Sequence, residues 1–477
     1  MVKRISEQER QAVLRMLARG EDRDTIAAMV DITPSQVSAI AAHVTMGTYE
    51  LPGLGESELQ LPEGQLGRIR HDSFGRTGVE RPPEAGNGID PVLLGVDAES
   101  GDEVFWNPDP ETGSANPHVL VLGESGFGKT YTISCLLGEL AQQRILSIVF
   151  DYGQGFSLNT LPPEFIAATD PIEILASRDG IDINPLQIFP TDLLGPVNVA
   201  QRVADTFARV YPRIGVQQHA VLRQAVLDIM TDEGITAEDG ESWTRALPAF
   251  AKIQHKLESF VNNPTGMSSR YASSVASHVS TMFVYNTFRS NGHKLSWPEM
   301  VGSNSRIFVI QLKGLEGSLE RAVTEFLLWN LIGYIESLGP SPLRCFVVLD
   351  EAHKLSFDLG SPVEKLLREG RKFGLGLILA SQQPEDFSSV AFANSATKIV
   401  FQVSDDRSTI SRQLHRKVRN AHSFKDIYEL ITKVPRGCAY VVSENVGRVA
   451  QITGFSERIK AWTEARQEIV FKERNDT

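Results

Sequence analysis

The chain has 477 residues, of which 42% are hydrophobic and 22% charged, and its formal net charge is −12 at pH 7. This length predicts two or three domains, because a single core stops growing at about 250–300 residues. The acidic balance excludes a wholly basic nucleic-acid coat protein, although it is compatible with DNA binding through a local basic surface.

The three cysteines, Cys135, Cys345 and Cys438, lie far apart in the sequence. This spacing favours buried reduced thiols in a cytosolic protein over a disulfide framework or a metal site. Charged residues interrupt the amino terminus, so no signal peptide is predicted. The longest apolar run, residues 326–335, is too short and polar to span a bilayer. We therefore expect a cytoplasmic protein that is not integral to a membrane.

Residues 6–45 predict a small unit of three helices. A capping box at residues 6–9 begins the first helix, and Pro34 stands at the first position of the third, where proline is tolerated. The apolar positions resemble the core of a helix-turn-helix module, and they are Ile26, Val30, Ile32, Val37 and Ile40. On that resemblance Ser35, Gln36 and Ser38 would face the major groove of DNA. Few basic residues flank the third helix, so a three-helix module that docks to protein is the alternative, and both stay open.

Residues 47–89 are rich in glycine, proline and charge, which predicts a linker with short strands. Residues 91–97 and 102–106 then predict a β-hairpin. An apolar strand at 118–122 follows, and it leads directly into the first motif that carries chemistry.

That motif is Gly-Glu-Ser-Gly-Phe-Gly-Lys-Thr at 123–130, which matches the phosphate-binding P-loop pattern without a gap. A helical stretch from Tyr131 to Gln142 follows. Glycines let backbone N–H groups turn toward a pyrophosphate, and the helix presents its positive end to the same anion. Lys129 would reach the β- and γ-phosphates of ATP, and Thr130 would hold Mg²⁺. The predicted nucleotide-binding residues are Gly123, Glu124, Ser125, Gly126, Phe127, Gly128, Lys129, Thr130 and Tyr131.

Further apolar runs at 145–150, 306–311, 345–349, 375–380 and 398–401 predict buried parallel strands. Residues 197–283 are mainly helical, which predicts a helical insertion. Strands that alternate with helices indicate an α/β fold of the P-loop NTPase type, RecA/ASCE-like, with a parallel sheet and a small all-α amino-terminal domain.

Asp350 and Glu351 directly follow the apolar run at 345–349 and form the acidic partner that a P-loop requires. Asp350 would hold the Mg²⁺ and its water shell, and Glu351 would polarise the attacking water. We expect this pair and the P-loop to lie on neighbouring strands of one sheet.

Three motifs then occur in order: Asp-Glu-Ala-His-Lys at 350–354, Arg-Glu-Gly-Arg-Lys-Phe-Gly at 368–374 and Ala-Ser-Gln-Gln-Pro at 380–384. In combination they closely resemble the HerA branch of the HerA–FtsK superfamily of hexameric DNA-pumping ATPases, and the resemblance runs from residue 90 to residue 455. It implies a homo-hexameric ring that hydrolyses ATP with Mg²⁺ and moves double-stranded DNA. Relatives commonly work with a separately encoded nuclease or another effector, such as an NAD-consuming enzyme, in DNA-end processing or antiphage defence.

The resemblance also implies roles for single residues. Gln382 would be the polar sensor of the γ-phosphate, and Arg371, with Arg368 as the alternative, would stabilise transition-state charge in its own site or across a subunit boundary. Asp151 corresponds to an acidic residue near the nucleotide, although an ordinary strand-end cap is the alternative. The chain departs from the family at Gln154, where relatives carry an acidic residue, and in its amino-terminal module, which replaces a β-barrel.

A basic run at 411–420 supplies the predicted DNA contacts Arg412, Arg416, Lys417 and Arg419, although a solvated helix face would look the same. Two further functions stay open, an ATP-switched scaffold ring that activates an effector and a conjugation or secretion ATPase. The predicted domains are a helix-turn-helix-like module (1–46), a linker with short strands (47–89), the P-loop half of the core (90–196), the helical insertion (197–300), the acidic-motif and sensor half (301–455) and a helical tail (456–477).

Overall fold

The computed structural model describes residues 12–14, 16, 23–30, 32–33, 37 and 40, and residues 89–464 except 110–112, 263–268, 290–295, 405, 419–421 and 444. The chain divides into two units, residues 1–80 and 81–477, and each is described by itself. Several predictions of the sequence fall outside the described residues: the groove-facing Ser35, Gln36 and Ser38, the DNA contact Arg419, and linker residues 47–88.

The first unit contains helix α2 (Arg23–Val30) and a small apolar core. Among the described residues, the buried members of this core are Val13, Leu14, Ile26, Ala27, Val37 and Ile40, and Val30 and Ile32 pack against them. The predicted apolar positions therefore do share one core. A core of this kind suits either reading of the module, so the helix-turn-helix assignment and its ligand stay predictions.

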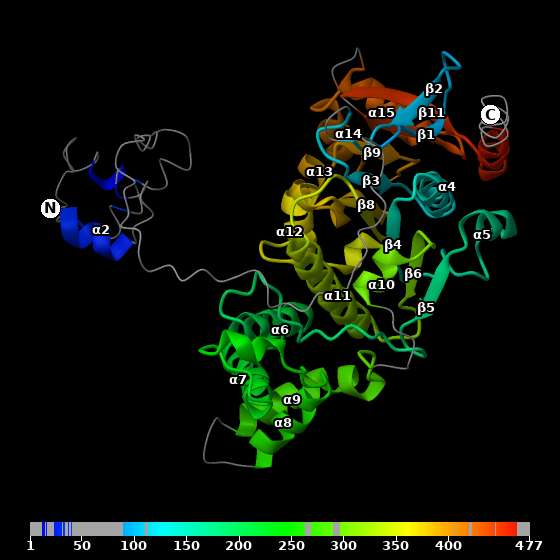
Figure 1. The fold of residues 1–477 in the computed structure, drawn as a ribbon. Helices are drawn as coiled ribbons and strands as arrows, with labels where there is room; N and C mark the ends of the chain where they lie inside the picture. Colours follow the sequence, from blue (N-terminus) through cyan, green and yellow to red (C-terminus); the bar gives the residue numbers. More distant parts are fainter. Residues whose placement is uncertain are drawn as a thin grey trace, which may run out of the picture. The chain divides into compact units, whose positions relative to one another are not determined.

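The second unit is built on one large, mostly parallel sheet (Figure 1), whose strand order is β2-β1-β11-β10-β9-β3-β8-β7-β4-β6-β5. From β9 to β5 all paired strands are parallel, and β10, β11, β1 and β2 extend the sheet as antiparallel strands. The strands are β1 (Val92–Asp97), β2 (Glu103–Trp106), β3 (Val119–Leu122), β4 (Leu146–Asp151), β5 (Ile172–Leu175), β6 (Ile307–Gln311), β7 (Cys345–Leu349), β8 (Leu375–Ser381), β9 (Thr397–Val400), β10 (Cys438–Ser443) and β11 (Val446–Ile452).

Helices cover both faces of the sheet, as the continuous apolar strands predict. Val119 and Val121 of β3 belong to the core under α4 (Lys129–Gln142) and α5 (Pro163–Thr169), whereas Leu120 and Leu122 face the opposite core. That second face carries α11 (Gly317–Ser337), α12 (Pro362–Glu369), α13 (Ser389–Asn394), α14 (Arg407–His415) and α15 (Phe424–Lys433). Helix α10 (Trp297–Gly302) precedes β6.

The predicted helical insertion is present as α6 (Pro196–Val210), α7 (Val216–Asp232), α8 (Lys252–Asn262) and α9 (Ser269–Tyr285), which lie together below the sheet in Figure 1. Aromatic rings join it to the core: Phe326 of α11 lies 5.2 Å from the ring of Phe207 and 5.3 Å from that of Phe250, both edge-on. Such contacts stabilise beyond the area they bury, so the insertion is fixed to α11.

The last described residues, 455–464, form a helix that packs on α4. Arg458 is 1% exposed and donates hydrogen bonds to Glu139 of α4 (2.8 Å) and to the carbonyl oxygens of Leu93 (2.6 Å) and Leu94 (3.0 Å) of β1. We call this set of contacts the Arg458 clamp. It ties the helix after the P-loop to the antiparallel end of the sheet.

Of the three cysteines, none forms a disulfide, and Cys135 and Cys345 are buried as predicted while Cys438 is partly exposed. Burial raises the pKa of Cys345 to about 12 and that of Cys135 to about 11, so both remain neutral thiols at neutral pH. Within the described part of the chain, no helix has both the length and the apolar character needed to cross a membrane.

Candidate active site

The P-loop connects the end of β3 to the start of α4 at the carboxyl edge of the sheet. Gly123 and Gly128 have φ angles of 147° and 113°, a region that side chains rarely adopt. A Cβ atom at Gly123 would also lie 2.5 Å from Cβ of Phe401, at the end of β9. The motif glycines are therefore required by the path of the loop itself, and this path turns toward the amino terminus of α4, where an anion is stabilised.

Lys129 is 9% exposed, and its ammonium donates to the carbonyl oxygens of Gly123 (2.7 Å) and Glu124 (3.0 Å) inside the loop. Burial lowers its pKa, while the carboxylates of Glu351 and Asp350 act in the opposite direction. The ammonium thus lies between the loop and the acidic motif. A phosphate in this cradle would meet a positive charge and a helix terminus together.

Asp350, which follows β7, and Thr130, in the first turn of α4, converge beside the P-loop. A Cβ atom at Gly155 would lie 3.6 Å from Oγ1 of Thr130 and 3.8 Å from Oδ2 of Asp350, so both groups border the same glycine. A hydroxyl and a carboxylate are oxygen donors that suit Mg²⁺, which usually takes one or two protein ligands together with phosphates and waters. The described residues contain no cluster of three or more His, Cys, Asp or Glu that could hold a metal by itself. The donor set therefore fits Mg²⁺ held jointly with a phosphate.

The order of the strands differs from the expected one. The sequence predicts the P-loop and the acidic pair on neighbouring strands, but β8 lies between β3 and β7. This prediction was wrong because β8, which follows β7 in the chain, pairs with both β3 and β7. The consequence is chemical, since β8 ends at Ser381 and so places Gln382 between the two motifs.

Glu351 and Gln382 are in contact. The amide nitrogen of Gln382 donates a hydrogen bond of 3.2 Å to Oε1 of Glu351. Glu351 has φ 61° and ψ 51°, a left-handed conformation that costs a non-glycine residue about 1–3 kcal/mol and is typical of functional sites. The predicted sensor and the predicted water-activating carboxylate are thus brought together, and their roles stay predictions.

Asp151 is fully buried and uses its carboxylate inside its own turn. It accepts hydrogen bonds from the backbone of Gly153 (2.9 Å) and Phe156 (2.7 Å) and from the side chain of Gln311 (2.6 Å). This pattern favours the strand-end cap over direct contact with nucleotide. The cap still contributes to the site, because it fixes the turn in which Gly155 lies next to Thr130 and Asp350.

The two candidate arginines lie at the other edge of the sheet. Arg371 belongs to the 3₁₀ turn η3 (Gly370–Phe373) that precedes β8, and it donates a 2.5 Å hydrogen bond to the carbonyl of Ala115, ahead of β3. Arg368, in the last turn of α12, pairs with Glu364. The structure does not bring either arginine to this P-loop. Only the version of the prediction in which an arginine acts across a subunit boundary remains.

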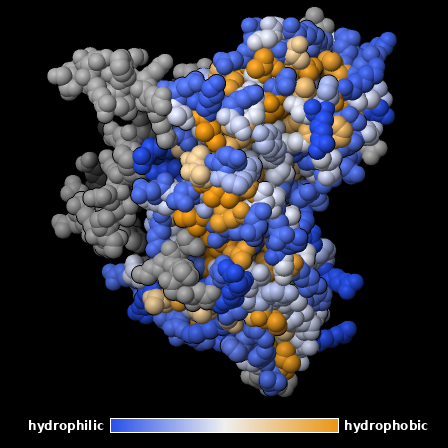
Figure 2. All heavy atoms as spheres, turned by 90° about the vertical axis from the view of Figure 1, so that its right-hand side faces the viewer, coloured by the Kyte–Doolittle hydropathy of each residue, from blue (hydrophilic) through white to orange (hydrophobic). Residues whose placement is uncertain are grey.

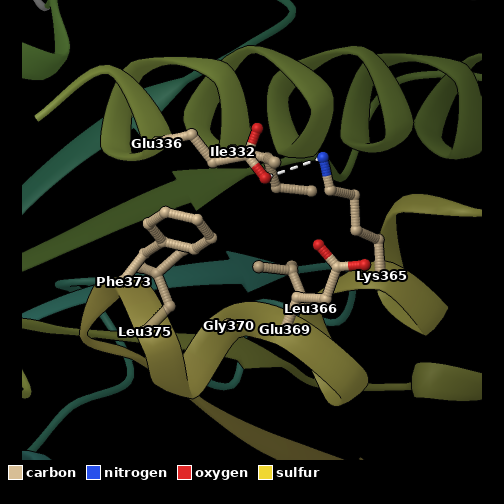
Figure 3. Close-up of a pocket in the computed structure, with 8 residues that line it drawn as sticks. All are labelled: Ile332, Glu336, Lys365, Leu366, Glu369, Gly370, Phe373 and Leu375. Carbon is tan, nitrogen blue, oxygen red and sulfur yellow. Dashed lines mark ion pairs between the residues drawn. The ribbon is translucent and has the colours of Figure 1, made fainter. Parts of the chain in front are cut away.

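Figure 3 shows how α12 and η3 are held against α11. Lys365 of α12 forms a 2.7 Å ion pair with Glu336 of α11 across a shallow groove between the two helices. Phe373 of η3 also lines this groove. Leu366 is buried between the two helices. Because α12 and η3 pack along α11 in this way, no small side-chain movement would carry the arginines across the sheet.

The described members of the basic run, Arg412, Arg416 and Lys417, are exposed near the carboxyl end of α14. They form no ion pair with any acidic side chain in the described part of the chain. We call these three exposed side chains the basic surface of α14.

Sequence reasoning missed three polar residues around Glu351, which are His353, Ser381 and Asp386. His353 Nδ1 lies 3.2 Å from Oε2 of Glu351 and 3.4 Å from Oγ of Ser381, and the Ser381 hydroxyl donates to Asp386. One signal was available: His353 lies two positions after Glu351, inside the motif at 350–354. Its partners Ser381 and Asp386 lie at the end of β8 and in the turn after it, about 30 residues further along the chain, so only the fold reveals them.

Asp350 is expected to destabilise the protein at high pH when metal and nucleotide are absent. Burial, together with the charges of Glu351 and Asp151, raises its pKa to about 7. In the unfolded chain the same carboxyl ionises near pH 4. The stability that the neutral carboxyl contributes is therefore complete below about pH 4 and is lost as the pH rises through 7. Asp350→Asn, which is always neutral, should unfold a few degrees above wild type at pH 8, and this advantage should shrink toward pH 4.

Thermal unfolding in EDTA at pH 5 and pH 8 measures this difference. Asp232→Asn, at an exposed position of α7, is the matched control and should follow wild type at both pH values. Equal unfolding temperatures for wild type and Asp350→Asn at pH 8 would show that the ionised Asp350 carboxylate does not destabilise the folded protein.

Comparison with known proteins supports this geometry. Residues 114–331 match the family model of the central domain of the helicase HerA. A search of the curated proteins finds no match to this chain. Among solved structures, VirB4 of Thermoanaerobacter pseudethanolicus is similar with a TM-score of 0.60 at 18% identity, covering 78% of this chain and 98% of that chain.

The bacterial conjugative coupling protein TrwB, in its unbound form lacking the first 70 residues, is similar with a TM-score of 0.51 at 15% identity over 78% of this chain and 89% of that chain. TrwB in complex with ADP and Mg²⁺ gives 0.50 at 16% identity, over 70% and 85%. These likenesses concern the fold, and they agree with the P-loop core described above. Residues 114–331 are therefore similar to the HerA central domain, and the core of the chain has the fold of these P-loop ATPases.

Proposed function

We propose that this chain is an ATP-driven translocase or helicase that assembles as a hexameric ring and moves double-stranded DNA, with ATP as substrate and Mg²⁺ as cofactor. Lys129 and the P-loop backbone would hold the phosphates, and Thr130 and Asp350 would hold the metal, whose charge would offset that of the phosphates. Glu351 orients and deprotonates the attacking water, and Gln382 senses the γ-phosphate.

A single observation carries the hydrolytic part of this proposal. Three strands, β3, β8 and β7, end side by side and bring the P-loop, Gln382 and the acidic pair to one edge of the sheet. The hydrogen bond of 3.2 Å between Gln382 and Glu351 joins the sensor to the base. A TrwB structure with a similar fold binds ADP and Mg²⁺, which supports the same ligands here.

DNA movement is supported by the matched helicase family and by the exposed basic surface at the end of α14. Phosphate contacts by Arg and Lys supply most of the sequence-independent affinity for DNA. Self-association is supported by apolar surface. Leu193, Leu194 and Leu359 are more than half exposed, and apolar patches interrupt the polar face in Figure 2. By family analogy, the ring would work with a separately encoded nuclease or NAD-consuming effector in DNA-end processing or antiphage defence.

The second candidate is a conjugation-type ATPase, which the likeness to VirB4 and to the conjugative coupling protein TrwB favours. Both candidates hydrolyse ATP at the same edge of the sheet. A scaffold ring that activates an effector without processive movement would use the same site as well. The measurement that separates a translocating motor from a scaffold ring is therefore movement along DNA.

We expect wild type to displace a triplex-forming strand from duplex DNA with ATP, after a delay that lengthens with the track. Arg416→Glu with Lys417→Glu should slow this displacement about tenfold or more. The two charges contact phosphates, so their loss should also flatten the plot of log affinity against log salt by about two units. Stopped-flow displacement and DNA titration at several salt concentrations measure both effects.

Arg223→Glu with Arg270→Glu, at exposed positions of α7 and α9, changes the net charge equally and should behave as wild type. If both double variants displaced the strand equally fast at low salt, the surface on α14 would not be the DNA contact.

Wild-type protein that hydrolyses ATP without displacing the triplex strand from a track of any length would favour the scaffold ring over the translocase.

A further inference from the structure

His353 lies in the 3₁₀ turn η2 (Ala352–Lys354) that follows the acidic pair. Its Nδ1 atom faces three oxygen atoms: Oε2 of Glu351 at 3.2 Å, Oγ of Ser381 at 3.4 Å and Oδ2 of Asp386 at 4.0 Å. These partners come from both sides of the site, since Glu351 follows β7 whereas Ser381 and Asp386 belong to the end of β8 and the turn after it.

The hydrogen bonds around this imidazole settle which atom carries its proton. The Ser381 hydroxyl donates to Asp386, so Ser381 offers His353 only a lone pair. Asp386 also accepts from the backbone N–H of Gln383 (3.2 Å). All three oxygens around Nδ1 are thus acceptors, so Nδ1 must be protonated whether the imidazole is neutral or charged.

Each carboxylate oxygen of Glu351 consequently has a different nitrogen neighbour. Oε1 accepts a hydrogen bond from the amide of Gln382, and Oε2 lies 3.2 Å from Nδ1 of His353. We infer that these two contacts set the direction of the Glu351 side chain.

The neighbouring cation does not compete for Glu351. Lys354 forms a 2.7 Å ion pair with Glu320 of α11, and its ammonium lies 4.7 Å from the centre of the Tyr152 ring. Gln382 can exchange its acceptor, because an amide N–H forms charge-assisted hydrogen bonds to a phosphate oxygen as well as to a carboxylate. His353 stays beside Glu351, because Ser381 and Asp386 face the same nitrogen and hold the imidazole in this position.

We propose that His353 is a positioning residue that fixes Oε2 of the Glu351 carboxylate. Only Oε1 then changes its hydrogen-bond donor, from the Gln382 amide to the attacking water. This inference rests on the proposed role of Glu351. The Ser381–Asp386 pair orients the imidazole, and a base with one fixed oxygen is held at the angle that proton transfer requires.

The test is steady-state kinetics of His353 variants. His353→Ala should lower kcat about tenfold with KM and nucleotide affinity changed less than twofold, because positioning acts on the chemical step. His353→Asn should recover most of the loss, since its amide N–H branches from the same position as Nδ1. His353→Leu should not recover it. His255→Ala is the matched control, because His255 is exposed on α8 beside Glu258 at 3.6 Å.

Combination with Glu351→Gln separates this inference from the function on which it rests. If Glu351→Gln alone is slow and His353→Ala slows it no further, His353 acts through Glu351. Equal kcat for His353→Ala and wild type, with Glu351→Gln slow, would overturn the inference and keep the proposed function. Wild-type turnover by Glu351→Gln would instead remove Glu351 as the base. Loss of thermal stability and of nucleotide affinity in all three His353 variants, with no recovery by Asn, would assign His353 a merely structural role.

Discussion

Glu351→Gln is expected to bind ATP as tightly as wild type and to lower kcat by about 100–10,000-fold, the usual contribution of a general base. The glutamine side chain has the same shape and keeps an oxygen that can accept from Gln382 or His353, so the left-handed turn at 350–354 should persist. It cannot accept a proton from water. The loss should therefore fall on turnover and spare binding.

Phosphate release under saturating ATP measures the turnover, and titration with a fluorescent nucleotide measures the affinity. Glu385→Gln, an exposed carboxylate in the turn that follows Gln382, is the control for a lost charge near the site. If Glu351→Gln and wild type turned over equally, the water would have to be activated elsewhere, and the acidic motif would serve only the metal.

Lys129→Ala is expected to weaken nucleotide binding about 100-fold or more, because a charge-assisted bond to phosphate in a buried site is worth roughly 1.5–3 kcal/mol and the loop geometry adds to it. The variant also leaves the carbonyls of Gly123 and Glu124 without their donor and Asp350 without its nearest cation. Both effects act in the same direction. Turnover should fall below detection at ATP concentrations that saturate wild type.

Nucleotide titration by calorimetry gives the affinity directly. Lys252→Ala, on the exposed side of α8 and paired with Glu233, removes a lysine outside the site and should bind ATP normally. A thermal unfolding curve for each variant shows whether the fold is retained. Wild-type affinity in a folded Lys129→Ala protein would mean that the loop at 123–130 does not hold the triphosphate.

The two hydrolysis motifs could be predicted from sequence because each is a local pattern. A P-loop between a strand and a helix, or two carboxylates after an apolar run, is fixed by neighbours in the chain. Strands β5, β10 and β11 were not predicted. In β11 the buried positions alternate irregularly with exposed ones such as Arg448, so the run lacks the continuous apolar signature of the central strands.

Relations between distant segments could not be predicted. Residue spacing places motifs at an edge of the sheet, but it does not give the order of parallel strands, and so the position of β8 was missed. The same limit explains why the contacts of His353 were missed. Ser381 and Asp386 are distant from His353 in the sequence, and only folding brings them within reach.

The Arg458 clamp has a mechanical consequence. A buried guanidinium that lost Glu139 would leave an uncompensated charge, so the bond is costly to break. Helix α4, strand β1 and the last described helix should then travel as one rigid body whenever the loop at 123–130 shifts around its ligand. A movement of α4 at the phosphate site would therefore also move β1, at the antiparallel end of the sheet. A spectroscopic label on residues 455–464 would detect this movement from outside the site.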